Sequence, residues 1–392
     1  MALEIINSKI VGTIEDLEEK LDGKIPIDRL ELIYLVNSWG RFESFNIKNS
    51  NNKTLKIGKC IAKECYKLNK LDVSQITNME DLFANSLFNG SINAWDVSNV
   101  TDMNSMFYST EKFNQDLNSW NTSNVTDMSC MFYFAKKFNQ DLNNWDVSKV
   151  TDMGRMFCNA TNFNRNILSW NVSNVINMNN MFSNAKKFNG DIGKWDVSNV
   201  TNMEGMFYSA EKFNQPLNFD TSNVISMISM FGYAESFNQE LNFNTSKVTS
   251  MKEMFYNAKS FNQKLNFNTN NVTNMKLMFC NAEKFNQPLN FDTSNVTSMI
   301  SMFYYARSFN QSLNFNISNA VDMNYMFYNT SAFINKYNNG LEIPYRTEDI
   351  KDWFNLNRDK MNDLDIKDRY GKEIDGFFSN FSNIELNNKQ LI

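Results

Sequence analysis

One short motif recurs along most of this sequence at a nearly constant spacing. The motif reads M-x-x-M-F, or M-x-x-L-F in its first copy, and it occurs eleven times. Its copies begin at Met79, Met103, Met128, Met153, Met178, Met203, Met227, Met251, Met275, Met299 and Met323. The spacing is 25 residues from Met103 to Met203 and 24 residues from there onward. A fixed period of about 20 to 50 residues is typical of proteins built from stacked repeats, so we predict a solenoid.

The repeat divides the chain into three parts. Residues 1–70 lack it, residues 71–333 carry it, and residues 334–392 lose it again. One unit alone buries too few apolar side chains to offset the entropy lost on ordering its backbone, so the units must stack. We therefore expect a continuous solenoid over 71–333. An N-terminal helical capping region (1–70) would precede it, and a helical cap or partner-binding region (334–392) would follow.

The spacing of apolar residues predicts a helix and a strand in each unit. The side chains at i, i+3, i+4 and i+7 would share one face of a short helix. In one unit these are Met128, Met131, Phe132 and Ala135. The apolar Phe138 and Leu142 lie four residues apart, as on one face of a short strand. Each unit is thus predicted to be a strand, a turn and about two turns of helix, which makes the fold class α/β.

The change of period follows from the loss of one residue beside an aromatic side chain. The longer units read Leu-Asn-Asn-Trp at 142–145, and the shorter units read Leu-Asn-Phe at 217–219. We expect the smaller aromatic residue of the shorter units to point inward as the tryptophan does. Phe219, Phe243 and Phe267 should therefore be buried.

An asparagine follows the buried phenylalanine in nearly every unit. Such amides normally hydrogen-bond to backbone at turns, so we interpret this column as a structural ladder between adjacent units. Its members are Asn114, Asn139, Asn164, Asn189, Asn214, Asn238, Asn262, Asn286 and Asn310, with Asn89 one unit earlier.

The units resemble a known repeat family. The stretches "FNQDLNNWDVSKVTDM" and "FDTSNVTSMISMFYYA" look like repeats of the BspA-like leucine-rich-repeat family of bacterial surface proteins. The resemblance covers about two thirds of the chain and implies a right-handed, curved, leucine-rich-repeat-like solenoid. It also implies adhesion to host or bacterial partners.

Composition excludes several other kinds of protein. The net charge is −5, and no part of the chain has the basic field that binding to nucleic acid or to an anionic membrane needs. No stretch approaches the ~18 apolar residues of a membrane span. The N-terminus, "MALEIINSKIVGTIEDLEEKL", has acids where a signal peptide has a basic start. We therefore expect a cytoplasmic protein, and the family resemblance implies a surface or secreted location as the alternative.

The sequence offers little for catalysis. It contains no histidine, which removes Ser-His and Cys-His nucleophile pairs and most zinc sites. Cys60 and Cys65 lack the spacing of the usual metal or redox pairs. Oxygens spaced for calcium at Asp96, Asn99 and Asp102 lose their last acid in later units. We expect no enzyme activity, cofactor, metal ion or small-molecule substrate.

The positions that vary between units are the candidates for binding. On the predicted strand side, the two residues after Phe-Asn differ from unit to unit, while the core positions do not. Because solenoids bind partners through extended surfaces, we take this side as the preferred contact surface for a protein partner. The candidate residues are Asp116, Asp141, Arg165, Asp191, Glu240 and Lys264.

The sequence thus predicts a non-enzymatic scaffold for protein–protein recognition. An adhesin-like protein is the first hypothesis. The alternative is an intracellular partner-binding protein, such as an immunity protein that neutralises a toxin, or an effector. An N-terminal pair of helices over residues 14–36 and a helix within residues 347–381 are expected to cover the ends of the stack.

Overall fold

The structure is a computed structural model. It describes residues 4–6, 9–11, 26–29, 32, 44–48, 54–58 and 65–370. Most of the two helices expected over 14–36 lies outside these residues. Arg29 and Leu32, which lie within this range, are helical. The described parts of the N-terminal region also contain strands, which were not predicted from the sequence.

Seven helices and strands are defined in the described residues. Strand β1 (Glu4–Ile6) pairs antiparallel with β2 (Lys9–Val11), and β3 (Ser44–Lys48) pairs antiparallel with β4 (Thr54–Gly58). A 3₁₀-helix, η1 (Cys65–Lys70), precedes the repeat. Helices α3 (Ser331–Asn338) and α4 (Thr347–Tyr370) follow it.

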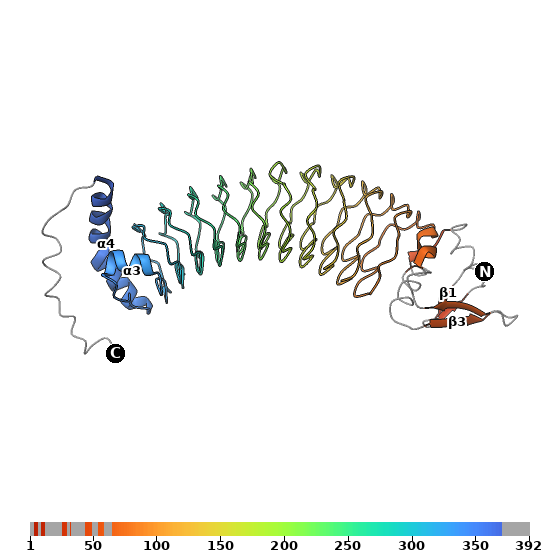
Figure 1. Cartoon of the computed structure of the whole chain (residues 1–392). Helices are drawn as coiled ribbons and strands as arrows, with labels where there is room; N and C mark the ends of the chain where they lie inside the picture. The colour runs from red at the N-terminus through yellow and green to blue at the C-terminus, as the bar shows by residue number, and fades with distance from the viewer. Residues whose placement is uncertain are drawn as a thin grey trace.

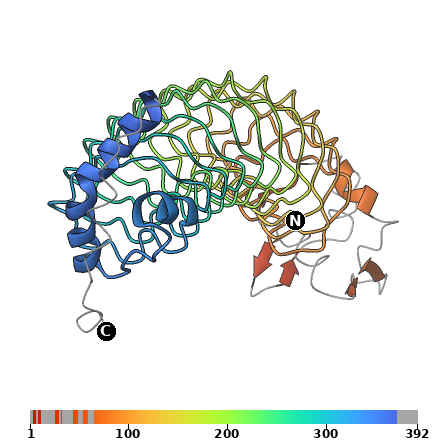
Figure 2. The ribbon, with the colours of Figure 1, turned by 60° about the vertical axis from the view of Figure 1, so that its left-hand side comes forward.

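The repeat region is an arched stack of coils, one coil for each sequence unit. The coils follow one another along the arch from η1 to α3 (Figure 1), and the turned view shows the same bend (Figure 2). Parallel bridges connect equivalent residues of successive coils, such as Asp102 with Asp127 and Asp127 with Asp152. The repeat solenoid predicted from the period is therefore the observed architecture.

The helix predicted in each unit is wrong. Residues 71–330 are all described, and they contain no α-helix. The M-x-x-M-F segment forms consecutive turns, in which the amide of Met106 donates to the carbonyl of Met103 (3.2 Å) and that of Thr110 to Phe107 (3.0 Å). Ser105 (φ 54°) and Ser109 (φ 53°) lie in the left-handed region, which ends any right-handed helix. Two such turns give the same apolar spacing as a short helix.

The turns leave every second amide of the segment free to bond to the next coil. The amides of Met103, Ser105 and Phe107 donate to carbonyls of Asp127, Ser129 and Met131 at 2.9–3.0 Å. The inter-coil ladder therefore runs through the segment that was predicted to be helical. The segment predicted as a strand shows only isolated bridges, such as Leu217 with Leu241. The α/β assignment thus fails for the repeat units.

The spacing between two neighbouring coils increases across the coil, which explains the arch. Between the units of Met103 and Met128, the ring centroids are 4.7 Å apart for Tyr108–Tyr133, 5.5 Å for Phe107–Phe132, 5.9 Å for Phe113–Phe138 and 6.3 Å for Trp120–Trp145. A stack bends toward its closely spaced side. The residues equivalent to Thr101–Ser109 therefore form the inner face of the arch, and the tryptophan side is the outer one.

The core consists of stacked columns of identical side chains. Phe132 contacts Phe138 of its own coil at a ring-centroid distance of 3.9 Å and Phe157 of the next coil at 5.5 Å. Phe219, Phe243 and Phe267 are 4%, 5% and 6% exposed, which confirms that the shorter units keep their aromatic residue inside.

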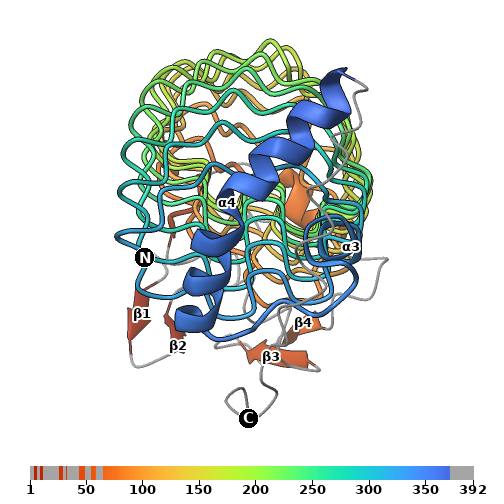
Figure 3. The ribbon, with the colours of Figure 1, turned by 90° about the vertical axis from the view of Figure 1, so that its left-hand side faces the viewer.

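Two helices cover the last coil. Helix α4 crosses the C-terminal end of the stack diagonally, with α3 beside it (Figure 3). The apolar residues Ile350, Trp353, Phe354 and Met361 of α4 are buried. The Trp353 ring lies 6.1 Å from that of Phe333 in α3. No helix in the described part of the chain combines the length and apolar character needed to cross a bilayer.

Candidate functional site

The candidate binding residues form a column and not a cluster. Asp116, Asp141, Asp191, Glu240 and Lys264 occupy the same position in different coils, and all are exposed. We call these equivalent positions the Asp116 column. A partner that contacts several of these residues must extend along the stack.

The aspartates of this column also have a structural role. The Oδ1 atom of Asp116 accepts a hydrogen bond from the amide of Asn118 (2.9 Å), and Asp141 and Asp191 hold the amides two residues later in the same way. Such a bond fixes a turn at the surface. Each carboxylate therefore uses only some of its hydrogen-bond acceptor positions within the chain.

Arg165 lies one position before the Asp116 column. Its Nε donates to the carbonyl of Asn139 (2.8 Å), where other coils have a glutamine, such as Gln140 donating to the carbonyl of Asn114 (3.1 Å). The guanidinium of Arg165 is therefore held against the coil before it, although its side chain is exposed.

The asparagine column connects the coils where their backbones do not bond directly. The Oδ1 atom of Asn114 accepts a hydrogen bond from the amide of Asn139 (2.8 Å). In the following coils the Oδ1 atom of each asparagine likewise accepts from the amide of the next one, through Asn139, Asn164, Asn189, Asn214, Asn238, Asn262, Asn286 and Asn310. Each bond satisfies an amide that has no backbone partner on this wider-spaced part of the coil.

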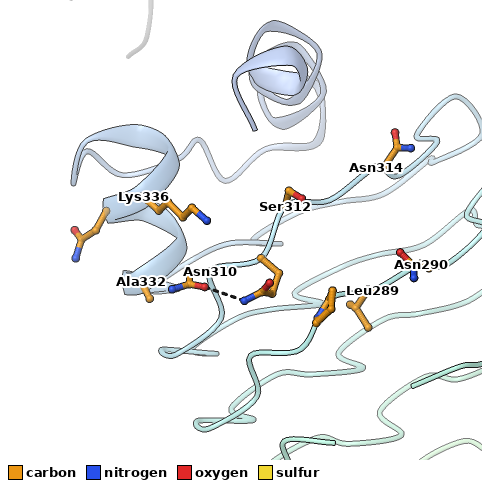
Figure 4. Close-up of a pocket in the computed structure, with 10 residues that line it drawn as sticks. Leu289, Asn290, Asn310, Ser312, Asn314, Ala332 and Lys336 are labelled. Carbon is orange, nitrogen blue, oxygen red and sulfur yellow. Dashed lines mark hydrogen bonds between the residues drawn. The ribbon is translucent and has the colours of Figure 1, made fainter. Parts of the chain in front are cut away.

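The Asp116 column ends in a pocket. A cavity of about 930 Å³ lies between the last coils and α3 (Figure 4). Pro288 and Ser312, which occupy the Asp116 column in their coils, line it, and α3 contributes Ala332, Asn335 and Lys336. The other lining residues are Leu289, Asn290, Asn310, Gln311 and Asn314. This pocket could not be predicted from the repeat pattern, because α3 forms one of its walls.

The lining chemistry suits recognition of polar groups. Five amide side chains offer both donors and acceptors, and Lys336 adds an ammonium group. Asn290, Asn314 and Asn335 are exposed and make no side-chain hydrogen bond within the described residues. The lining contains no carboxylate, thiol or imidazole that could act as a general base or nucleophile.

Burial disfavours the thiolate form of two cysteines in the repeat. Cys158 and Cys280 are buried free thiols. Burial raises the pKa of Cys158 to about 11 and that of Cys280 to about 12, so both stay protonated near neutral pH. Within the described residues, no group of three or more metal-ligating side chains could hold a metal ion.

Comparisons with known proteins identify a family but no activity. The model of the family described as "Mycoplasma protein of unknown function, DUF285" matches residues 55–157, 140–243, 217–266 and 238–340. No curated protein matches the chain. A chain in the crystal structure of the TLR13-ssRNA13 complex is similar at 12% identity and a TM-score of 0.20. That similarity covers 69% of this chain and 50% of that one, so this chain spans about half the length of the structure it matches.

Proposed function

The chain belongs to the DUF285 family of Mycoplasma proteins of unknown function, and we propose that it is a non-enzymatic scaffold that recognises protein partners. The observation that carries this proposal is the geometry of the Asp116 column. Its side chains from Asp116 to Pro288 are exposed, vary among the coils, and lead to an open pocket lined with amides. An extended, rigid surface of this kind is what solenoid proteins use for binding.

The pocket favours an extended peptide as the bound element. A peptide backbone carries one donor and one acceptor per residue, which asparagine and glutamine side chains can both satisfy. Asn290 and Asn314 occupy the same position in consecutive coils, so they repeat along the stack with the rise of one coil. An extended segment can therefore hydrogen-bond to both coils and place its end against α3.

The handedness, the number of coils and the repeat type of the stack are also part of this proposal. We propose that the stack is a right-handed, leucine-rich-repeat-like solenoid of eleven coils of the BspA-like type, with adhesin-like binding as its role. The bridge positions from Asn78 to Asp322, which follow the period of the motif, and the bend toward the inner face support it. Protein recognition inside the cell remains the competing assignment, and localisation of the native protein separates the two.

Selection of peptides from a random display library on the immobilised protein tests the proposal. Peptides should be enriched, and Asn314→Trp, which fills the pocket, should abolish their binding. The matched control is Asn218→Trp, because Asn218 occupies the same position in a coil remote from the pocket and is exposed. A failure to enrich any peptide would overturn the proposed function, and equal loss with both variants would move the site away from the pocket.

A further inference from the structure

Five tyrosines gather at the C-terminal end of the inner face. The Tyr304 ring stacks on Tyr328 (centroid distance 5.2 Å), and Tyr325 stacks on Tyr345 (5.4 Å). Tyr325 meets the edge of Tyr328 at 6.0 Å, and Tyr305 lies 4.7 Å from Tyr304. The rings thus form one continuous group, which we call the tyrosine patch.

The patch is held by the backbone of the segment that precedes α4. The amide of Tyr325 donates to the carbonyl of Tyr345 (2.7 Å), in the position where other coils bond to the next coil. The amide of Met323 donates to Oγ1 of Thr347 (2.9 Å), the first residue of α4. Residues 345–347 therefore continue the inter-coil ladder by one step and fix Tyr345 beside Tyr325.

The patch is exposed although the end of the stack is covered. Tyr325 is 44% exposed and Tyr345 is 48% exposed. Helix α4 contacts other parts of the end, because Arg358 bonds to the carbonyl of Phe315 and Lys360 to that of Tyr337. Tyr325 and Tyr345 are two of the eight exposed large apolar side chains of the described residues, and their rings are in contact. Exposed apolar side chains that lie together mark interaction sites.

Two arginines border the patch. The guanidinium of Arg307 lies 5.5 Å from the Tyr305 ring centroid, and that of Arg346 lies 5.9 Å from the Tyr345 centroid. Both arginines are exposed, and neither forms an ion pair with a carboxylate in the part of the chain that the structure describes. A guanidinium held over a ring still presents its N–H groups, and its preferred acceptor is a carboxylate.

Two acids near the patch, Asp322 and Glu348, make contacts within the chain. Oδ1 of Asp322 accepts hydrogen bonds from the amide of Asn324 (3.0 Å) and from Thr347 Oγ1 (3.3 Å). Glu348 lies 4.0 Å from Lys351 of its own helix. Burial raises the pKa of Tyr304, so its hydroxyl remains a donor. The border of the patch therefore offers unpaired cationic and hydroxyl donors.

The stacking of the tyrosine rings favours a protein partner over a nucleic acid. Bases bind proteins by stacking on open ring faces. Here Tyr304 and Tyr328 stack on each other, as do Tyr325 and Tyr345, so one face of each ring is occupied. The Arg346 guanidinium also lies over the Tyr345 ring. Ring edges, hydroxyls and guanidinium groups remain available. Tyrosine and arginine are the residue types enriched at the energetic centres of protein–protein interfaces.

We infer that the tyrosine patch with Arg307 and Arg346 is a second docking surface, which binds an acidic, aromatic segment of a protein partner. The inference rests on the proposed protein-recognition function but uses the inner face and not the pocket. Partner carboxylates would bond to the two guanidinium groups, and partner aromatic side chains would pack against the exposed ring edges.

Fluorescence anisotropy with a labelled glutamate–tyrosine copolymer tests the inference. The full chain should bind it, and the double variant Arg307→Gln/Arg346→Gln should weaken binding by about tenfold or more. The control is Arg155→Gln, an exposed arginine at the position of Tyr325 in another coil, which should leave binding unchanged. A second variant, Tyr325→Ala, should also weaken it.

Two outcomes overturn the inference: no binding of the copolymer by the unmodified chain, and equal binding of the copolymer by the double variant. In the first case, binding of single-stranded polyuridylate that depends on the same arginines would assign the surface to a nucleic acid. The pocket variant Asn314→Trp separates the two sites: it should leave copolymer binding intact even if no library peptide is ever enriched.

Discussion

The indole Nε1 of Trp145 donates a hydrogen bond of 2.9 Å to the backbone carbonyl of Leu117 in the preceding coil. The same bond recurs for Trp120, Trp170 and Trp195 in the other long coils. Each tryptophan therefore fills the widest part of the coil and also satisfies a buried carbonyl. The short coils have phenylalanine at this position, without a donor, and are one residue shorter.

Replacement of Trp145 by phenylalanine should therefore destabilise the protein although phenylalanine is native in the short coils. The change leaves the carbonyl of Leu117 unpaired and opens a cavity, which together cost about 2–4 kcal/mol. Urea unfolding measures the loss. The exposed neighbour change Asn144→Ala should stay within about 0.5 kcal/mol, and a Trp145→Phe effect of the same size would contradict the role of the indole.

Glycine substitution distinguishes the observed turns from the helix that the sequence suggested. Asn180 has φ 53°, whereas its neighbour Asn179 is not among the residues with positive φ. Asn180→Gly should leave stability nearly unchanged, since glycine adopts this backbone without strain, while Asn179→Gly should cost about 0.5–1 kcal/mol. In a helix both changes would be destabilising. Thermal unfolding of the two variants gives the comparison.

The buried positions of the coil were predictable from the sequence because each recurs with the same residue type. Met128, Met131, Phe132 and Phe138 are all fully buried. Their local backbone was not predictable. Left-handed residues end the turns, yet those positions hold serine, cysteine and arginine (Ser105, Cys130, Arg155), which do not signal positive φ.

The candidate sites were only partly accessible to sequence reasoning. The Asp116 column follows from comparing units, because its position varies while the core does not. The pocket and the tyrosine patch depend on where α3 and residues 345–347 pack against the last coils. Both segments follow the last copy of the repeated motif, so the repeat period does not predict their positions. Tyr345 lies outside the repeat, so nothing in the sequence places it beside Tyr325.

Removal of one complete unit should preserve the fold. Deleting residues 129–153 joins Met128 to Gly154, and this restores the same sequence of positions in the coil. Because each coil contacts mainly its neighbours, the shortened protein should unfold cooperatively with a slightly lower melting temperature. Deleting about half a unit shifts the register of every column and should prevent folding. Equal disruption by both deletions would argue against independent coils.

Acid should destabilise the protein partly through the aspartates at the outer turns. Hydrogen bonds from the hydroxyl and amide of Ser98 lower the pKa of Asp96, and those from Ser148 lower that of Asp146. A lowered native pKa contributes stability above the unfolded value of about 3.8, and this contribution is lost as the pH falls through the native pKa.

The double variant Asp96→Asn/Asp146→Asn should therefore show a smaller drop in melting temperature between about pH 5 and about pH 2.5. Asparagine is compatible with the turn, since Oδ1 of Asn171 accepts the amide of Ser173 (3.2 Å) at the equivalent position. If the melting temperature of the double variant falls as much as that of the unmodified protein, other carboxylates cause the acid sensitivity.

Amide hydrogen exchange with and without a library-selected peptide tests whether the solenoid recognises protein segments through its exposed columns and the pocket that ends them. Peptide binding should slow exchange in residues 286–316 and in α3, with little change in the coils before residue 200. Protection confined to the N-terminal coils, or no protection anywhere in the repeat, would contradict it.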